Sequence, residues 1–193
     1  MSQGPISESL KKAEIHKEAG NALLKKALAL YQNDPEQHVL YTKALREYHN
    51  ANLYLRSVDA SESKREGMDD LLTGFLEEKQ KKTKEDKEQI QELKCKIWNN
   101  MSLIYHKINK PERVIEFCRY IINIRENDEK ALLKLVNAYI EIEDYENAEE
   151  CIKKLSGKCK TDDKEIEKLK KKINTKRKIT DTKLMSSFKN YSI

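Results

Sequence analysis

Two polar side chains near the start of the chain, Lys17 and Asn21, have types and a spacing that suit them to hold an acidic group together. They stand four residues apart in the stretch KEAGN, residues 17–21, and residues at this spacing lie on the same face of a helix. Lysine supplies a positive charge, and the asparagine amide supplies N–H donors for a carboxylate oxygen. A solvated helix face could carry the same pair, so the elements that position these residues decide between the two interpretations.

The composition predicts what those elements are. The chain has 193 residues, which is enough for one domain. Hydrophobic residues make up 38% of it and charged residues 37%, so we expect a thin core and a densely charged surface. Five glycines and three prolines are too few for a turn-rich β fold, and the abundant Lys, Glu, Leu and Ala form helices readily. We therefore expect an all-α fold.

The sequence indicates a cytoplasmic protein with no cofactor and no metal. No apolar run approaches the ~18 residues that a membrane span needs, and the opening residues, MSQGPISESLKK, contain no apolar signal core. The cysteines form no C-x-x-C pair, so we expect them to be reduced and buried rather than joined in disulfides or bound to zinc. They are Cys95, Cys118, Cys151 and Cys159.

Small and apolar residues recur at one fixed spacing in the second half of the chain, which gives a repeat length of about 34 residues. The recurring pairs are Ser102 and Val136, Tyr105 and Tyr139, Val114 and Ala148, and Cys118 and Ile152. Each unit has the pattern of a helix, a short turn and a second helix, with small positions that let the two helices approach. A single pair cannot bury its apolar faces, so units of this kind stack.

An irregular unit precedes these two repeats. The three units together predict the organisation of the whole chain. We expect a flexible N-terminus (1–9), a first repeat (10–58), a charged insert (59–92), a second repeat (93–127), a third repeat (128–160), and a basic capping helix and tail (161–193). Residues 60–72 of the insert are polar and rich in serine, so we expect them to be mobile.

The positive charge of the chain is concentrated at its C-terminus. Residues 164–189 carry a net charge of +7, whereas the whole chain carries +5. The rest of the chain therefore has a net charge of −2. The apolar stripe of Ile166, Leu169 and Ile173 predicts a long terminal helix that caps the stack. The same segment would also suit binding to nucleic acid or anionic lipid, or a calmodulin-type helix anchored by Leu169, Ile173 and Ile179.

The repeat resembles the tetratricopeptide repeat, whose pattern places small residues at its eighth and twentieth positions. The resemblance implies three helix-turn-helix repeats in a right-handed superhelix, followed by a long C-terminal capping helix. In this register Gly20 takes the eighth position of the first repeat. The alanine of the twentieth position, Ala44, stands twice as far from Gly20 as in an ideal repeat. Extra residues therefore lengthen the first helix pair or its turn.

With this register, five polar residues coincide with the dicarboxylate clamp of chaperone-binding tetratricopeptide domains. The family pattern is Lys and Asn in the first unit, Asn in the second, and Lys and Arg in the third. Four residues match the pattern identically, Lys17, Asn21, Asn100 and Lys130, and the fifth position is taken by Lys134. The last departs from the pattern because lysine replaces arginine, and it loses the bidentate fork of arginine, so we expect weaker or less selective binding.

Longer stretches, such as EYHNANLYLRSVDA and the segment from 112 to 155, resemble the tetratricopeptide repeat domain 9 family and the repeat domain of immunophilin co-chaperones. The resemblance implies an adaptor or co-chaperone that binds the acidic Glu-Glu-Val-Asp tail of heat-shock protein 90 or 70. The alternatives are a scaffold that binds another protein partner without the clamp, and a basic-tail binder of nucleic acid or anionic lipid.

Nothing in the sequence predicts catalysis. The four histidines are scattered, and no phosphate-binding G-x-x-x-x-G-K, metal-binding H-E-x-x-H or nucleophile G-x-S-x-G motif is present. We therefore expect a binding protein and not an enzyme.

Overall fold

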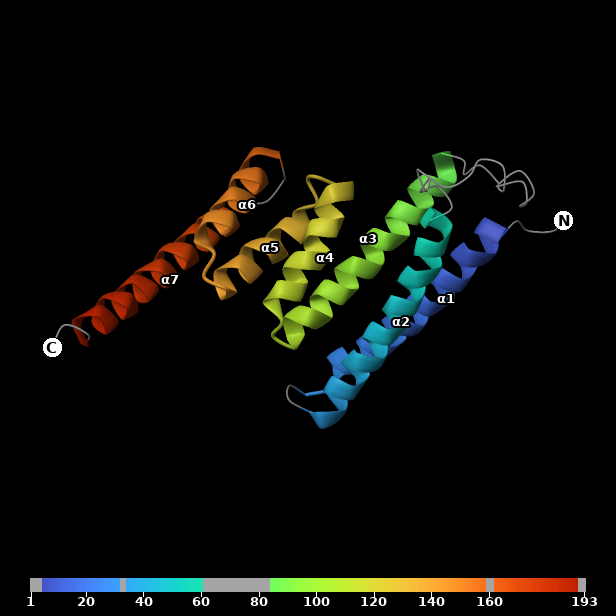
Figure 1. The fold of residues 1–193 in the computed structure, drawn as a ribbon, viewed down its shortest axis with the longest axis horizontal. Helices are drawn as coiled ribbons and strands as arrows, with labels where there is room; N and C mark the ends of the chain where they lie inside the picture. The colour runs from blue at the N-terminus through green and yellow to red at the C-terminus, as the bar shows by residue number, and fades with distance from the viewer. Residues whose placement is uncertain (1–4, 32–33, 61–83, 159–161, 191–193) are drawn as a thin grey trace, which may run out of the picture. The chain divides into compact units, whose positions relative to one another are not determined.

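The computed structural model describes residues 5–31, 34–60, 84–158 and 162–190, and these residues form helices and no strand (Figure 1). The helices are α1 (Pro5–Ala29), α2 (Pro35–Ala60), α3 (Lys84–Lys107), α4 (Pro111–Ile124), α5 (Glu129–Glu141), α6 (Tyr145–Lys158) and α7 (Asp163–Asn190). The prediction of an all-α fold is confirmed. The chain forms two compact units, Met1–Asn100 and Met101–Ile193.

In the first unit, α1 and α2 pack side by side along their lengths (Figure 1). Small side chains permit this close approach, and four alanines are completely buried: Ala13, Ala27, Ala44 and Ala51. Larger apolar residues on the same helices, including Leu24, Tyr48 and Leu55, are also buried. Ala44, the small residue at the twentieth position of the first repeat, therefore belongs to the packed face of α2.

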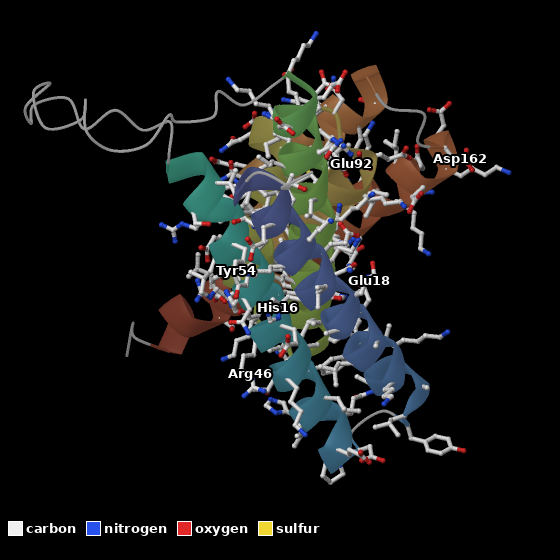
Figure 2. The ribbon with its side chains drawn as sticks, turned by 90° about the vertical axis from the view of Figure 1, so that its right-hand side faces the viewer. His16, Glu18, Arg46, Tyr54, Glu92 and Asp162 are labelled. Atoms are coloured by element: carbon white, nitrogen blue, oxygen red, sulfur yellow. The ribbon has the colours of Figure 1, made fainter. Side chains whose placement is uncertain are left out.

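A polar and aromatic contact on one side of this helix pair joins α1 to α2. His16 Nδ1 lies 2.7 Å from Glu47 Oε2, and the His16 ring stacks on Tyr54 with the ring centroids 5.5 Å apart. Figure 2 shows His16 and Tyr54 on neighbouring helices, with Glu18 on the other side of α1. Because His16 and Glu47 lie 31 residues apart and on different helices, the spacing of residues along the chain could not reveal this partner.

Aspartates immediately precede four of the helices. Their Oδ1 atoms accept a backbone N–H from the following helical turn at 2.8–3.2 Å, and they are Asp34, Asp128, Asp144 and Asp162. Such bonds satisfy donors that have no partner within the helix, and each is worth ~1 kcal/mol. The boundaries of α2, α5, α6 and α7 are therefore set by local side-chain chemistry.

The repeat in the sequence is visible in the backbone of the second unit. Asn109 and Glu143, which occupy corresponding positions of two successive repeats, both adopt left-handed conformations with φ of 54° and 61°. The residue after each donates its N–H across the turn at 2.9 Å, Lys110 to Tyr105 and Asp144 to Tyr139. Two corresponding turns thus use the same conformation and the same hydrogen bond.

We expect Glu143→Gly to raise the free energy of unfolding by ~0.5–1 kcal/mol, because a left-handed φ is strained for glutamate and not for glycine. Glu146→Gly is the matched control, since Glu146 is also exposed but lies in the first turn of α6. The control should lower the free energy of unfolding by ~1 kcal/mol. Urea denaturation of both variants measures this, and a destabilising Glu143→Gly would show that the turn does not carry the strain.

Helix α7 confirms the predicted terminal helix, and it packs on α6 and α5. Ile166, Leu169 and Ile173 are buried, as their spacing predicted. Arg177 extends the contact with an ion pair to Glu149 at 2.8 Å, and it lies over the ring of Tyr145. Two of the three residues considered as anchors of a calmodulin-type helix, Leu169 and Ile173, are therefore buried against the rest of the second unit.

One helix boundary differs from the expected segments, because α1 begins at Pro5, inside the N-terminal segment expected to be flexible. Helix α3 begins at Lys84, ahead of the second repeat, and the helical spacing of Ile90, Leu93 and Ile97 predicts this early start. The segment 60–72, which we expected to be mobile, lies almost entirely outside the described residues. No helix among the described residues has the length and apolar character needed to cross a membrane.

Three of the cysteines, Cys95, Cys118 and Cys151, are free and buried as predicted, whereas Cys159 lies outside the described residues. Burial raises the pKa of both Cys118 and Cys151 to about 11. Both are therefore thiols at neutral pH and pack as small apolar side chains.

Candidate functional site

Lys17 is a buried charged residue on α1, with only 7% of its surface exposed. Its Nζ forms ion pairs with Glu14 Oε1 and, at 2.9 Å, with Glu18 Oε1. Burial alone would lower the pKa of Lys17, but the hydrogen bonds to Glu14 and Glu18 outweigh it and the net shift is upward. Lys17 therefore carries a firmly held positive charge at neutral pH.

Asn21 lies in a hydrogen-bond network with Tyr48 and Asn100. Its Oδ1 accepts two hydrogen bonds of 2.8 Å each, one from the Tyr48 hydroxyl and one from Asn100 Nδ2. Asn100 Nδ2 also lies 3.2 Å from the Tyr48 oxygen. Because both donors reach the carbonyl end of Asn21, its amide nitrogen is turned the other way, where it donates to Glu18 Oε2 at 3.2 Å.

Gly20 makes this arrangement possible because it leaves room for the Tyr48 ring. A Cβ atom at position 20 would lie 2.7 Å from Tyr48 Cε1 and 2.9 Å from Cδ1. Tyr48 is completely buried, and burial raises its pKa to about 12. Its hydroxyl therefore stays protonated and remains a hydrogen-bond donor to Asn21.

Glu18 shows what this half of the site can do chemically. Its two carboxylate oxygens are held separately, Oε1 by Lys17 and Oε2 by Asn21. The hydrogen bonds from Lys17 and then Asn21 lower the pKa of Glu18, which keeps it ionised. One ammonium and one amide thus hold the single carboxylate of Glu18.

The second unit contains the other two predicted site residues, Lys130 and Lys134, one turn apart on α5. Lys134 is partly buried, and its Nζ donates to Ser102 Oγ at 2.9 Å. Burial lowers the pKa of Lys134, an effect opposed by the nearby Cys118 and Asp128. Lys130 is exposed at the surface of the same helix.

The structure brings Lys17, Asn21 and Asn100 into one cluster in the first unit, and it places Lys130 and Lys134 together in the second. That all five act on one ligand stays a prediction. Sequence reasoning missed the partners of these residues, which are Glu14, Glu18, Tyr48 and Ser102. The spacing of Glu14 and Lys17, three residues apart on a helix, is a signal that could have revealed the first ion pair.

The described residues hold no group of three or more His, Cys, Asp or Glu side chains arranged to bind a metal ion. The contacts of the predicted site residues join amide, ammonium and hydroxyl donors to carboxylate, amide and hydroxyl oxygens. Such a set can recognise an anionic group by charge and hydrogen bonding.

The fold is that of a tetratricopeptide-repeat domain, as the sequence pattern predicted. The chain is similar in structure to the C-terminal TPR-containing domain of an FK506-binding protein from Plasmodium falciparum, with a TM-score of 0.59 and 18% sequence identity. The similarity covers 92% of this chain and 95% of that one. No protein-family model and no curated protein matches the chain.

Proposed function

We propose that this chain is a protein-binding adaptor of the co-chaperone type. Its ligand is an acidic C-terminal peptide, of the kind that ends heat-shock protein 90 and 70 in Glu-Glu-Val-Asp. The observation that carries the proposal is that Lys17 and Asn21 already hold a carboxylate, that of Glu18, through one oxygen each. Capture of a C-terminal carboxylate by such donors is a recurring mode of peptide recognition.

Each predicted residue has a role in this proposal. Lys17 supplies charge to a ligand carboxylate, and Asn21 supplies an amide N–H. Asn100 and Tyr48 keep that amide turned toward the ligand, because both donate to Asn21 Oδ1. Lys130 and Lys134 add the positive charge that an acidic peptide requires, with Lys134 held in place by Ser102. The function proposed is equilibrium binding in the cytoplasm and not catalysis.

A second feature supports a protein ligand of this class. The solved structure that the chain resembles is a TPR-containing domain of an FK506-binding protein, and the sequence independently resembles the repeat domain of immunophilin co-chaperones. The rival function is a repeat scaffold that binds another protein without using these five residues. The basic α7 as a binder of nucleic acid or anionic lipid is the third candidate, and no contact among the described residues favours it over the peptide ligand.

Calorimetric titration with a peptide ending in Glu-Glu-Val-Asp tests the proposal. We expect micromolar affinity, about −7 to −8 kcal/mol, which weakens as salt rises, because exposed charges are screened over ~8 Å at physiological ionic strength. A parallel titration with RNA and with anionic vesicles tests the third candidate. Absence of peptide binding together with binding to either of these would replace the adaptor proposal.

A further inference from the structure

Glu18 lies where a ligand carboxylate would bind if the proposed function is right. Its Oε1 is 2.9 Å from Lys17 Nζ, and its Oε2 is 3.2 Å from Asn21 Nδ2. These are the two donor groups that the first unit offers to an acidic peptide. Glu14, one turn earlier on α1, forms a second ion pair with the Lys17 ammonium.

The charge balance of this half of the site is consequently negative. Lys17 contributes one positive charge, while Glu14 and Glu18 contribute two negative charges within direct contact of it. An acidic peptide that approaches Lys17 therefore meets repulsion before it meets attraction. A clamp built only for tight binding would not need either carboxylate.

We propose that Glu18, assisted by Glu14, is a built-in competitor that occupies Lys17 and Asn21 until an acidic peptide displaces it. This inference rests on the proposed function and describes how that same site is regulated. Glu18 acts as a specificity-determining residue. A ligand that replaces Glu18 on Lys17 and Asn21 gains binding free energy only if it makes more carboxylate contacts than Glu18 does.

The exchange is physically easy because both glutamates lie at the surface. The side chains of Glu14 and Glu18 are 53% and 61% exposed, so each can rotate into water without unfolding the helix. Although Lys17 itself is buried, the carboxylate end of each pair is in contact with water, so solvent and salt screen the attraction. The ligand carboxylate takes over the hydrogen bonds from Lys17 and Asn21, and no covalent bond forms or breaks.

The competitor model predicts that Glu18→Gln binds the Glu-Glu-Val-Asp peptide more tightly than the unmodified chain, by ~3- to 5-fold, the upper part of the range for a lost surface ion pair. Glu14→Gln should act in the same direction. The matched control is Glu8→Gln, which removes the same charge from the same helix but from a pair with Lys12. Position 8 is ~13 Å along the helix from Lys17, beyond the screening distance, so its effect should stay within ~2-fold.

The salt dependence of the peptide affinity is a second measurement. It would not change if Glu18 had a purely structural role. Peptide binding by Glu18→Gln should fall more steeply with salt than binding by the unmodified chain, because the variant offers the ligand a less negative site. Thermal melting of all variants confirms that each is folded, and Glu14→Gln is the second test should Glu18→Gln fold poorly.

Two outcomes would overturn the inference, and they differ in what they say of the proposed function. If the peptide binds in a Lys17-dependent way but Glu18→Gln and Glu14→Gln match Glu8→Gln in affinity and salt dependence, the competitor is disproved and the adaptor stands. If no variant shows Lys17-dependent binding, both the competitor and the carboxylate site are disproved.

Discussion

Gly20→Ala is expected to lower the free energy of unfolding by ~1–3 kcal/mol, the usual cost of overpacking a core. The added Cβ would stand 2.7 Å from the ring of Tyr48, which is completely buried and cannot swing into solvent. The ring or the two helices must shift, and the hydroxyl of Tyr48 then moves away from Asn21. The variant should therefore lose peptide affinity as well as stability.

The chain offers a control for this substitution in Gly157, a helical glycine of α6. A Cβ added at that position meets nothing within 4 Å. Gly157→Ala should consequently raise the free energy of unfolding by ~0.5–1 kcal/mol, as alanine does in open helix positions. Denaturant unfolding of the two variants should give opposite signs. A neutral or stabilising Gly20→Ala would contradict the close packing of α1 against α2.

Lys17→Met should weaken binding of the acidic peptide by ~10- to 100-fold, the range for a lost hydrogen bond to a charged group. Methionine keeps the buried apolar stem of the side chain but removes the ammonium, so the fold should be retained. Glu14 and Glu18 would then face the ligand without their shared partner and repel it. Lys25→Met is the matched control, because Lys25 is exposed on the same helix. Equal affinities of the two variants in calorimetry would exclude Lys17 from the site.

Much of the fold could be predicted from the sequence because its causes are local or periodic. The small and apolar pairs that recur at the repeat spacing reflect the packing of one helix on the next, and the structure repeats one turn conformation at Asn109 and Glu143. The stripe of Ile166, Leu169 and Ile173 predicted the terminal helix, because burial on one face follows the helical period. The start of α1 was harder to predict, because Pro5 can begin a helix but does not require one.

The partners of the site residues could not be predicted in the same way. The bond between Tyr48 and Asn21 joins residues 27 apart on two helices, and it depends on how closely the helices approach at Gly20. The bridge from Glu18 to Lys17 and Asn21 depends on the rotamers of three side chains. Residue types and register therefore indicated where a carboxylate could bind, but not that the chain supplies one of its own.

The central claim is that the donor groups of this chain recognise the terminal carboxylate of an acidic peptide. The most direct test is a calorimetric comparison of two Glu-Glu-Val-Asp peptides that differ only at the C-terminus, one with a free carboxylate and one amidated. We expect the free peptide to bind with micromolar affinity and the amidated peptide to lose most of that affinity, because amidation removes the charge and an acceptor oxygen. Equal binding of the two peptides would contradict the claim and favour a repeat scaffold that recognises its partner elsewhere.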